Sequence, residues 1–264
     1  MRATAIDGTM AEAVDEGRGR ALLVIHGGMG DPSSWRRVTD RLRDRFRTVR
    51  LHRRQYRLDL ARPVTMADEV EHVVAVAGEL ERPVLVGHSS GAVLALEAML
   101  ADPRLFAGAV LYEPPVVTGA PLGGSAQVAA RAALAEGNPG KAVTIFMRDV
   151  VRVPAPTAAF AGFVIGRSRY RDRVVRQLDD NDAIDALGVR LGAYQAIDLP
   201  VLLVGGDRSP AHLGERLDAL ERALPHTSRL LMHGQGHNAE MRAPDRLATA
   251  IGKFADELPG PPKP

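Results

Sequence analysis

The chain has 264 residues, of which 45% are hydrophobic and 25% charged, and its formal net charge is +2. These values are ordinary for a globular protein and argue against disorder as the default state. Cysteine is absent, which excludes disulfides, thiolate metal ligands and a cysteine nucleophile.

Short β-branched runs alternate with longer helical patterns, which favours a mostly parallel sheet covered by helices. In chain order, the predicted strands are Ala21–Ile25, Thr48–Leu51, Val84–Val86, Ala109–Leu111, Leu199–Val204 and Ser228–Met232. The helices predicted between and after them are Ser34–Asp44, Thr65–Leu80, Ser90–Leu100, Ser209–Leu224 and Pro244–Leu258. Asp31 or Ser33 is expected to cap the first helix and Thr65 the second.

Strand-like runs disappear between Pro114 and Asp198, where the pattern becomes helical. The helical stretches there are Ser125–Glu136, Pro139–Val150 and Arg169–Asp182. Prolines and glycines separate them. We therefore predict one core made of residues 1–114 and 199–260, with residues 115–198 inserted as a helical cap or lid.

The strongest chemical signal is Gly87-His88-Ser89-Ser90-Gly91, a G-x-S-x-G motif between a predicted strand and a predicted helix. In this setting the serine sits on a sharp, strained turn that exposes its hydroxyl. Glycine is expected on both sides because side chains there would collide with neighbouring backbone. The motif predicts Ser89 as a nucleophile. Ser90 lacks the flanking glycines.

A serine hydroxyl needs a base to accept its proton and an acid to orient that base. After a serine elbow of this kind, the acid and then the histidine follow in chain order. Asp207 directly follows the strand Leu199–Val204 and is the predicted acid; Glu113, after Ala109–Leu111, is the alternative. His237, in a glycine-rich loop after the last strand, is the predicted base.

Acyl transfer also needs amide donors for the oxyanion. One predicted donor is the amide of Ser90, which follows the nucleophile. The other is expected in the glycine-rich segment after the first strand, with Gly28 as first choice and Met29 as second. This segment matches neither the phosphate-loop pattern nor the dinucleotide-binding pattern.

The sequence says less about binding partners and cellular location than about the chemistry. The N-terminus has no apolar stretch typical of a signal peptide, and no apolar run approaches the roughly 18–20 residues that span a bilayer. We expect a cytoplasmic protein with no membrane partner. The arginine-rich segment 36–57 has few interleaved aromatics and contains acidic residues, so we interpret it as a solvated helix face and loop rather than a nucleic-acid site.

Five segments in this order together resemble the α/β-hydrolase superfamily: HGG at 26–28, GHSSG at 87–91, YEPP at 112–115, GGDRSP at 205–210 and GQGH at 234–237. The resemblance runs from about Ala21 to Leu258. It implies an α/β fold with a mostly parallel sheet of about eight strands and a helical lid inserted between late strands. Because Ala3–Val14 is a poor strand pair, we expect the sheet to be short of its first strands.

The resemblance implies a serine hydrolase that cleaves a carboxylic ester, lactone or thioester through an acyl-serine intermediate. The same triad could serve carbon–carbon bond hydrolysis, perhydrolysis or a biosynthetic cyclisation, and a non-catalytic ligand-binding role is a further alternative. Ser89 argues against the family branches that use an aspartate nucleophile. The substrate is expected to be a small molecule, with no metal or organic cofactor. Monomer and homodimer remain open.

Overall fold

A computed structural model describes residues 1–166 and 171–259. Its eight strands form one sheet in the order β1-β2-β4-β3-β5-β6-β7-β8. Their bounds are β1 Arg2–Thr4, β2 Met10–Glu16, β3 Ala21–Ile25, β4 Arg47–His52, β5 Val84–His88, β6 Gly108–Tyr112, β7 Val201–Gly206 and β8 Thr227–Met232. From β4 to β8 all neighbouring strands are parallel. The predicted mostly parallel sheet and its six predicted strands are confirmed.

The sheet is complete at its N-terminal edge, so the expectation that its first strands would be missing is wrong. β1 and β2 pair antiparallel with each other, and β2 pairs antiparallel with β4. Ion pairs join β2 to β4: Arg47 to Asp15 at 2.7 Å and Arg50 to Glu16 at 2.5 Å. Cross-strand charge pairs of this kind stabilise an edge strand that offers few apolar residues.

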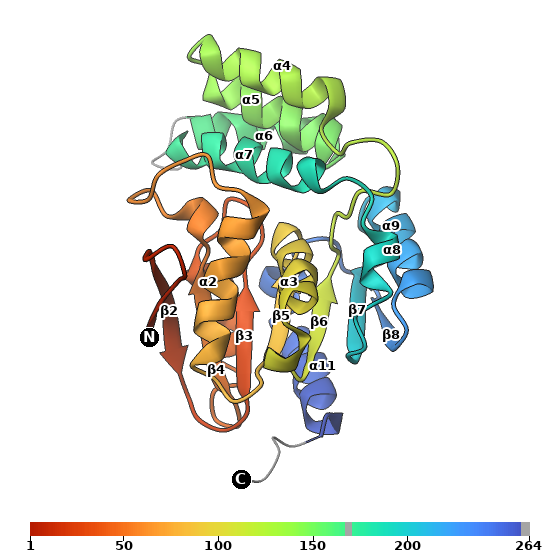
Figure 1. The fold of residues 1–264 in the computed structure, drawn as a ribbon. Helices are drawn as coiled ribbons and strands as arrows, with labels where there is room; N and C mark the ends of the chain where they lie inside the picture. Colours follow the sequence, from red (N-terminus) through yellow and green to blue (C-terminus); the bar gives the residue numbers. More distant parts are fainter. Residues whose placement is uncertain (167–170, 260–264) are drawn as a thin grey trace.

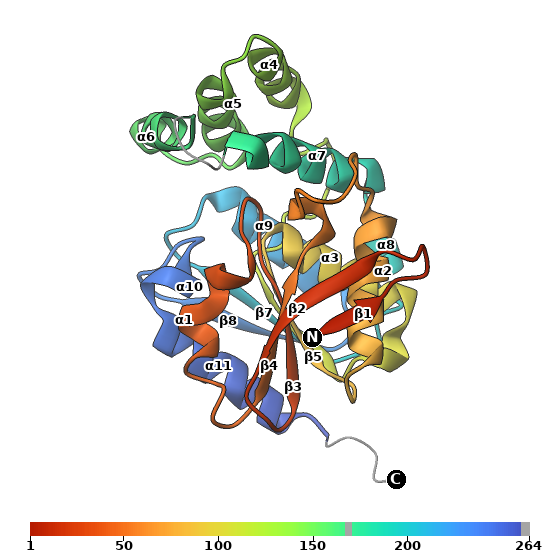
Figure 2. The same ribbon diagram turned by 90° about the vertical axis from the view of Figure 1, so that its left-hand side faces the viewer.

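Helices cover both faces of the sheet (Figures 1 and 2). One face packs against α2 (Met66–Gly78), α3 (Ser90–Ala101), α8 (Leu191–Tyr194) and α9 (Ala211–Ala223). The other packs against α1 (Arg36–Thr39), α10 (Ala239–Arg242) and α11 (Pro244–Glu257). The central strands β3, β5 and β6 are buried along their whole length, as expected for parallel strands covered on both faces.

The predicted caps and helices agree with the structure except at the first helix. Thr65 caps α2 by accepting a hydrogen bond from the Asp68 amide at 3.2 Å. The expected helix Ser34–Asp44 is instead a 3-10 turn, Pro32–Trp35, capped by Asp31, followed by the four-residue α1. Successive turns after α1 bring Leu42 and Phe46 against the same apolar cluster as α11, and these contacts outweigh helix continuation.

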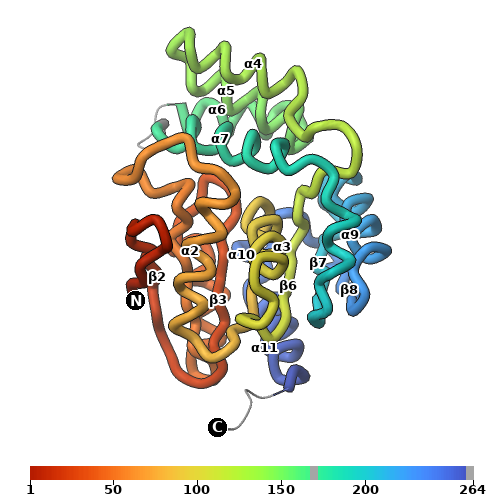
Figure 3. The backbone as a smooth tube through the Cα atoms, in the orientation of Figure 1, coloured from red at the N-terminus to blue at the C-terminus, as the bar shows by residue number. Residues whose placement is uncertain are grey.

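Most of the segment between β6 and β7 forms a helical layer above one end of the sheet (Figures 1 and 3), whereas α8, near the end of this segment, packs on the sheet beside α9. The layer contains α4 (Gly124–Ala135), α5 (Pro139–Ile145), a π-helical turn (Phe146–Val150), α6 (Ala155–Gly166) and α7 (Arg171–Leu187). Its helices share a small apolar cluster of their own. We call residues 115–198 the helical insertion; its functional separation from the core remains a prediction.

The sequence pattern does not predict α6, because its two prolines indicate a break in helical structure. Pro154 and Pro156 lie at the N-terminal end of this helix, where a missing backbone N–H costs little. Of the predicted helix Arg169–Asp182, residues 169 and 170 lie outside the described residues, as does residue 260 of the predicted core. Among the helices that the structure describes, none combines the length and apolar character needed to cross a membrane.

Candidate active site

Ser89 lies between the last residue of β5 and the first residue of α3. Its φ of 53° is in the left-handed region, which a residue with a side chain adopts only when its surroundings enforce it. Its amide donates to the Tyr112 carbonyl at 2.9 Å. The predicted strand–turn–helix setting is therefore present, with the serine at its apex.

Two glycines make this turn possible. A Cβ on Gly87 would lie 2.6 Å from the Cα of Ala92, and one on Gly91 would lie 2.4 Å from the carbonyl oxygen of His26. Both contacts are with backbone, which cannot swing aside as a flexible side chain would. The glycines therefore allow α3 to start close against the end of β3.

Gly91→Ala is expected to destabilise the protein by roughly 1–3 kcal/mol, the usual cost of overpacking a rigid site. Urea denaturation would measure this loss. Gly78→Ala, near the end of α2, is the matched control because nothing lies within 4 Å of an added Cβ there. Equal stability of the two variants would contradict the steric explanation of the motif.

The acid beside His237 is Glu113. Its Oε2 lies 2.6 Å from His237 Nδ1, and its Oε1 accepts a hydrogen bond from the Gly206 amide at 2.7 Å. Glu113 directly follows β6 and is 1% exposed. Both oxygens of this buried carboxylate therefore have a partner. Because the carboxylate is held in place, it fixes the orientation of the His237 imidazole.

Asp207 lies at the end of β7 as predicted, but its predicted pairing with His237 is wrong. Its carboxylate accepts a hydrogen bond from the Gly234 amide at 2.7 Å and lies 3.2 Å from His233 Nδ1. The His233 side chain is 78% exposed. The loop after β8 turns through Gly234, which has φ 75°, and this turn leaves His233 beside Asp207 while His237 reaches Glu113.

His88 and Tyr112, which belong to two of the sequence motifs, hold the His237 loop in place. The motifs alone do not indicate this role. His88 Nε2 donates to the His237 carbonyl at 2.9 Å, and the Tyr112 hydroxyl donates to the Gly236 carbonyl. Burial lowers the pKa of His88 to about 3, so this imidazole is neutral near pH 7. The strand that leads to Ser89, β5, and its neighbour β6 thus both contribute to positioning His237.

Ser89 and His237 line one cavity of about 310 Å³ together with Gly28, Met29 and Ser90. The Ser90 amide begins α3 and therefore has no acceptor in the preceding turn. The helical insertion contributes mainly apolar side chains to this cavity. They are Leu122, Phe146, Met147, Val150, Val151 and Ile165.

Gly28 lies against the helical insertion. A Cβ at this position would be 2.1 Å from the Oε1 atom of Gln177 in α7, so glycine lets the loop after β3 pass beneath that helix. The backbone of Met29, the next residue, lies in the left-handed region with φ 55°. The three predicted oxyanion-hole residues therefore line the same cavity as Ser89. Their donation of hydrogen bonds to an oxyanion is a proposal.

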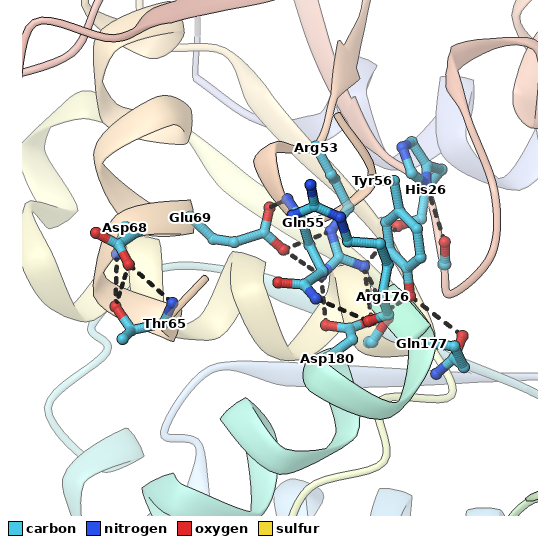
Figure 4. A network of polar contacts seen from close by, with 12 residues as sticks. His26, Arg53, Gln55, Tyr56, Thr65, Asp68, Glu69, Arg176, Gln177 and Asp180 are labelled. Atoms are coloured by element: carbon cyan, nitrogen blue, oxygen red, sulfur yellow. Dashed lines mark hydrogen bonds and ion pairs between the residues drawn. The ribbon is translucent and has the colours of Figure 1, made fainter. Parts of the chain in front are cut away.

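A buried ionic network lies behind this loop (Figure 4). Its centre is Arg53, which is fully buried. The guanidinium donates from Nε to Glu69 Oε1 at 2.9 Å, from Nη2 to Asp180 Oδ1 at 2.7 Å and from Nη1 to Ser90 Oγ at 2.7 Å. The Tyr56 hydroxyl donates to Asp180 Oδ2 at 2.7 Å. One cation thus joins α2, α7 and the first residue of α3.

This network corrects the interpretation of the arginine-rich segment 36–57 as a solvated surface. Arg50, Arg53 and Arg57 are buried and each is paired with a carboxylate. Burial raises the pKa of Glu69 despite the nearby Arg53. Glu16, which pairs with Arg50, and Asp180, which pairs with Arg53, come from distant parts of the chain, so no local pattern could reveal these two pairings.

Comparisons with known proteins agree with this architecture. A family model described as "Alpha/beta hydrolase family" matches residues 22–250. A search of curated proteins finds no match. An α/β hydrolase from Sphaerobacter thermophilus DSM 20745 is 24% identical, with a TM-score of 0.81 over 97% of this chain and 100% of its own.

Two solved esterases are also similar in fold. The thermophilic esterase from Thermogutta terrifontis is 18% identical, with a TM-score of 0.77 over 97% of this chain and 98% of its own. The esterase RhEst1 from Rhodococcus sp. ECU1013 is 19% identical, with a TM-score of 0.74 over 98% and 99%. Since the family model covers most of the length and the eight-stranded sheet has the matching architecture, this chain belongs to the alpha/beta hydrolase family.

Proposed function

We propose that this hydrolase cleaves a carboxylic ester, lactone or thioester through an acyl-Ser89 intermediate. The observation that carries the proposal is the meeting of a serine on a strained elbow and a Glu113-paired histidine at one cavity. A triad is recognised by such geometry and roles rather than by sequence position.

In the proposed mechanism, His237 Nε2 accepts the Ser89 proton while Oγ attacks the substrate carbonyl carbon. The amides of Ser90 and of Gly28, or Met29 in its place, donate to the oxyanion. As the tetrahedral intermediate collapses, the imidazolium returns the proton to the leaving group. His237 next deprotonates a water that attacks the acyl carbon, and the acid product leaves as Ser89 regains its proton. Glu113 replaces the predicted Asp207 as the group that holds Nδ1–H and stabilises the imidazolium.

The division into a core and a cap forms part of this proposal. Residues 1–114 and 199–259 would supply the triad and the oxyanion donors. The helical insertion, residues 115–198, would cover the triad and supply the apolar wall of the acyl pocket. Such a wall favours a small-molecule substrate with an apolar portion near the scissile carbonyl.

Labelling with a fluorophosphonate probe tests the proposal. The probe is expected to attach to Ser89, as located by mass spectrometry, and the label is expected to vanish in Ser89→Ala. Ser34→Ala is the matched control, because Ser34 lines the same cavity and its loss should leave labelling intact. A folded protein that stays unlabelled, or that is labelled at another residue, would contradict an activated Ser89.

A panel of aryl esters, thioesters and lactones then separates the bond classes. Turnover of at least one of these substrates supports acyl hydrolysis. Efficient labelling of Ser89 without turnover of any of them would instead indicate carbon–carbon hydrolysis, perhydrolysis or a cyclisation by the same triad.

A further inference from the structure

The cavity beside Ser89 contains a cation that forms no ion pair with a carboxylate in the described part of the chain. Arg216, on α9, lines the cavity. Its Nε donates to the Val116 carbonyl at 2.9 Å and its Nη1 to the His212 carbonyl at 2.9 Å. Within residues 1–166 and 171–259, no acidic side chain forms an ion pair with it. The guanidinium is held through Nε and Nη1, and no described residue accepts a hydrogen bond from its Nη2. Burial, together with the charge of Arg152, lowers the pKa of Arg216.

His212 lies one helical turn before Arg216 and lines the same cavity. It is only 7% exposed, and its Nδ1 is enclosed by protein without a hydrogen-bond partner. Nε2 is therefore the ring nitrogen available to a bound molecule. Burial and the neighbouring Arg216 lower the pKa of His212 to about 4, so the imidazole is neutral at pH 7 and can donate through a single N–H. Arg216 Nη2 and His212 Nε2 can therefore donate hydrogen bonds to a bound molecule, because no described residue accepts from them.

We propose that Arg216 and His212 form a subsite for a carboxylate group carried by the substrate. This inference rests on the proposed hydrolase function and names its substrate class: an ester, lactone or thioester with an additional carboxylate. A cation that is partly withdrawn from water and has no directly paired counter-ion is destabilised, and a bound carboxylate would supply the missing partner. The planar guanidinium edge matches the two oxygens of a carboxylate.

The surroundings favour a single negative charge over a phosphate dianion. Glu113 is buried nearby and paired with His237. Glu240 also lines the cavity, and burial raises its pKa to about 7, so it carries part of a negative charge near neutral pH. The cations that face these carboxylates are Arg216 and the neighbouring Arg152, since the His212 imidazole is neutral. Two cations beside Glu113, Glu240 and the nearby Asp185 leave little net positive charge for a dianion. The remaining wall is largely apolar, which suits a substrate with an apolar segment between its ester and its carboxylate.

Matched ester pairs test the subsite. Mono-4-nitrophenyl adipate is compared with 4-nitrophenyl hexanoate, and 4-carboxyphenyl hexanoate with phenyl hexanoate, after subtraction of spontaneous hydrolysis. In at least one pair, the wild-type protein is expected to favour the carboxylate member in kcat/KM. In Arg216→Gln, kcat/KM for that member is expected to fall by about 30-fold or more, while the neutral ester changes by less than about threefold.

Arg222→Gln is the matched control, because Arg222 is an exposed arginine on the same helix; it should leave both rates unchanged. Arg216→Lys should recover only part of the preference, since lysine lacks the planar fork. Equal loss for neutral and charged esters in Arg216→Gln, or no carboxylate preference in either pair, would overturn the subsite.

A measurement on the unmodified protein avoids any folding defect of the variants. Adipate is expected to slow fluorophosphonate labelling of Ser89, whereas hexane-1,6-diol should not. Stronger protection by inorganic phosphate than by adipate would overturn the carboxylate assignment. Normal labelling without protection by adipate would refute only the subsite, whereas complete absence of labelling would refute the proposed function itself.

Discussion

Glu113→Gln is expected to lower kcat for an activated ester by about 10³–10⁴-fold, whereas Asp207→Asn should change it by less than about threefold. The glutamine keeps the shape of the side chain but removes the charge that stabilises the imidazolium. It also allows the amide group to present N–H instead of oxygen to His237 Nδ1, which favours the wrong tautomer. Steady-state kinetics on one aryl ester would measure both variants.

The two substitutions form a matched pair, because each replaces a carboxylate by its amide beside a histidine at the same edge of the sheet. Circular dichroism and thermal melting should first show that both variants are folded. A large loss of kcat in Asp207→Asn combined with a small loss in Glu113→Gln would support Asp207 as the acid, as first predicted from the sequence. It would contradict the role that we assign to the 2.6 Å contact between Glu113 and His237.

Arg53→Met is expected to cost about 3–5 kcal/mol of unfolding free energy, the range found when one partner of a buried ion pair is removed. Glu69 and Asp180 would remain buried side by side without their cation, and methionine offers neither charge nor donors. Urea denaturation followed by circular dichroism would measure the change. Arg45→Met is the control, since the pair of Arg45 with Asp256 is exposed and should contribute less than about 1 kcal/mol.

A triple variant tests whether the loss of stability in Arg53→Met comes from the unpaired carboxylates or from lost packing. Adding Glu69→Gln and Asp180→Asn to Arg53→Met removes the orphaned charges and should recover part of the lost stability, because the penalty arises mainly from unpaired buried groups. If the triple variant were no more stable than Arg53→Met, the loss would come from packing. Similar losses in Arg53→Met and Arg45→Met would show that the buried network contributes no more than a surface pair.

The sequence predicted the strand–turn–helix geometry of the elbow because that geometry depends on local rules. A serine flanked by glycines between a strand and a helix is typical of such a turn, and Ser89 lies in one with φ 53°. The acid could not be chosen in this way. β6 and β7 are neighbours in the sheet, so Glu113 and Asp207 emerge at the same edge, and both satisfy the order of acid before histidine.

The path of the loop after β8 determines which of these two acids contacts His237. The turn at Gly234 brings the Gly234 amide and His233 to Asp207, and the hydrogen bonds from His88 and Tyr112 draw His237 towards β6. The contacts of His88 and Tyr112 join residues 149 and 124 positions apart, and those of Asp207 join residues 26 and 27 positions apart. Hydrophobic periodicity carries no information about them, which explains why the strands were predicted more reliably than the partner of His237.

The edge strands and the arginines were missed for a related reason. β2 has few strongly apolar residues, and its partners Arg47 and Arg50 looked like surface charges until β4 was placed beside it. Arg53 likewise needs a carboxylate from α7, which is supplied by Asp180. Composition reports how many charges a chain has but cannot tell which of them face each other.

The attachment of α7 also determines which part of the insertion can be exchanged. Besides the contact of Asp180 with Arg53, Gln55 Nε2 donates to the Arg176 carbonyl at 2.7 Å and Arg176 Nη2 to the Leu60 carbonyl at 2.6 Å. In chain order α7 belongs to the insertion, yet its polar contacts fix it to the core that carries Ser89 and His237. Helices α4 to α6 pack on α7 through an apolar cluster, and Gln127 and Arg131 of α4 add polar contacts with it. A protein engineer seeking a new substrate range could therefore graft foreign helices in place of α4–α6 and keep α7 as the graft's platform.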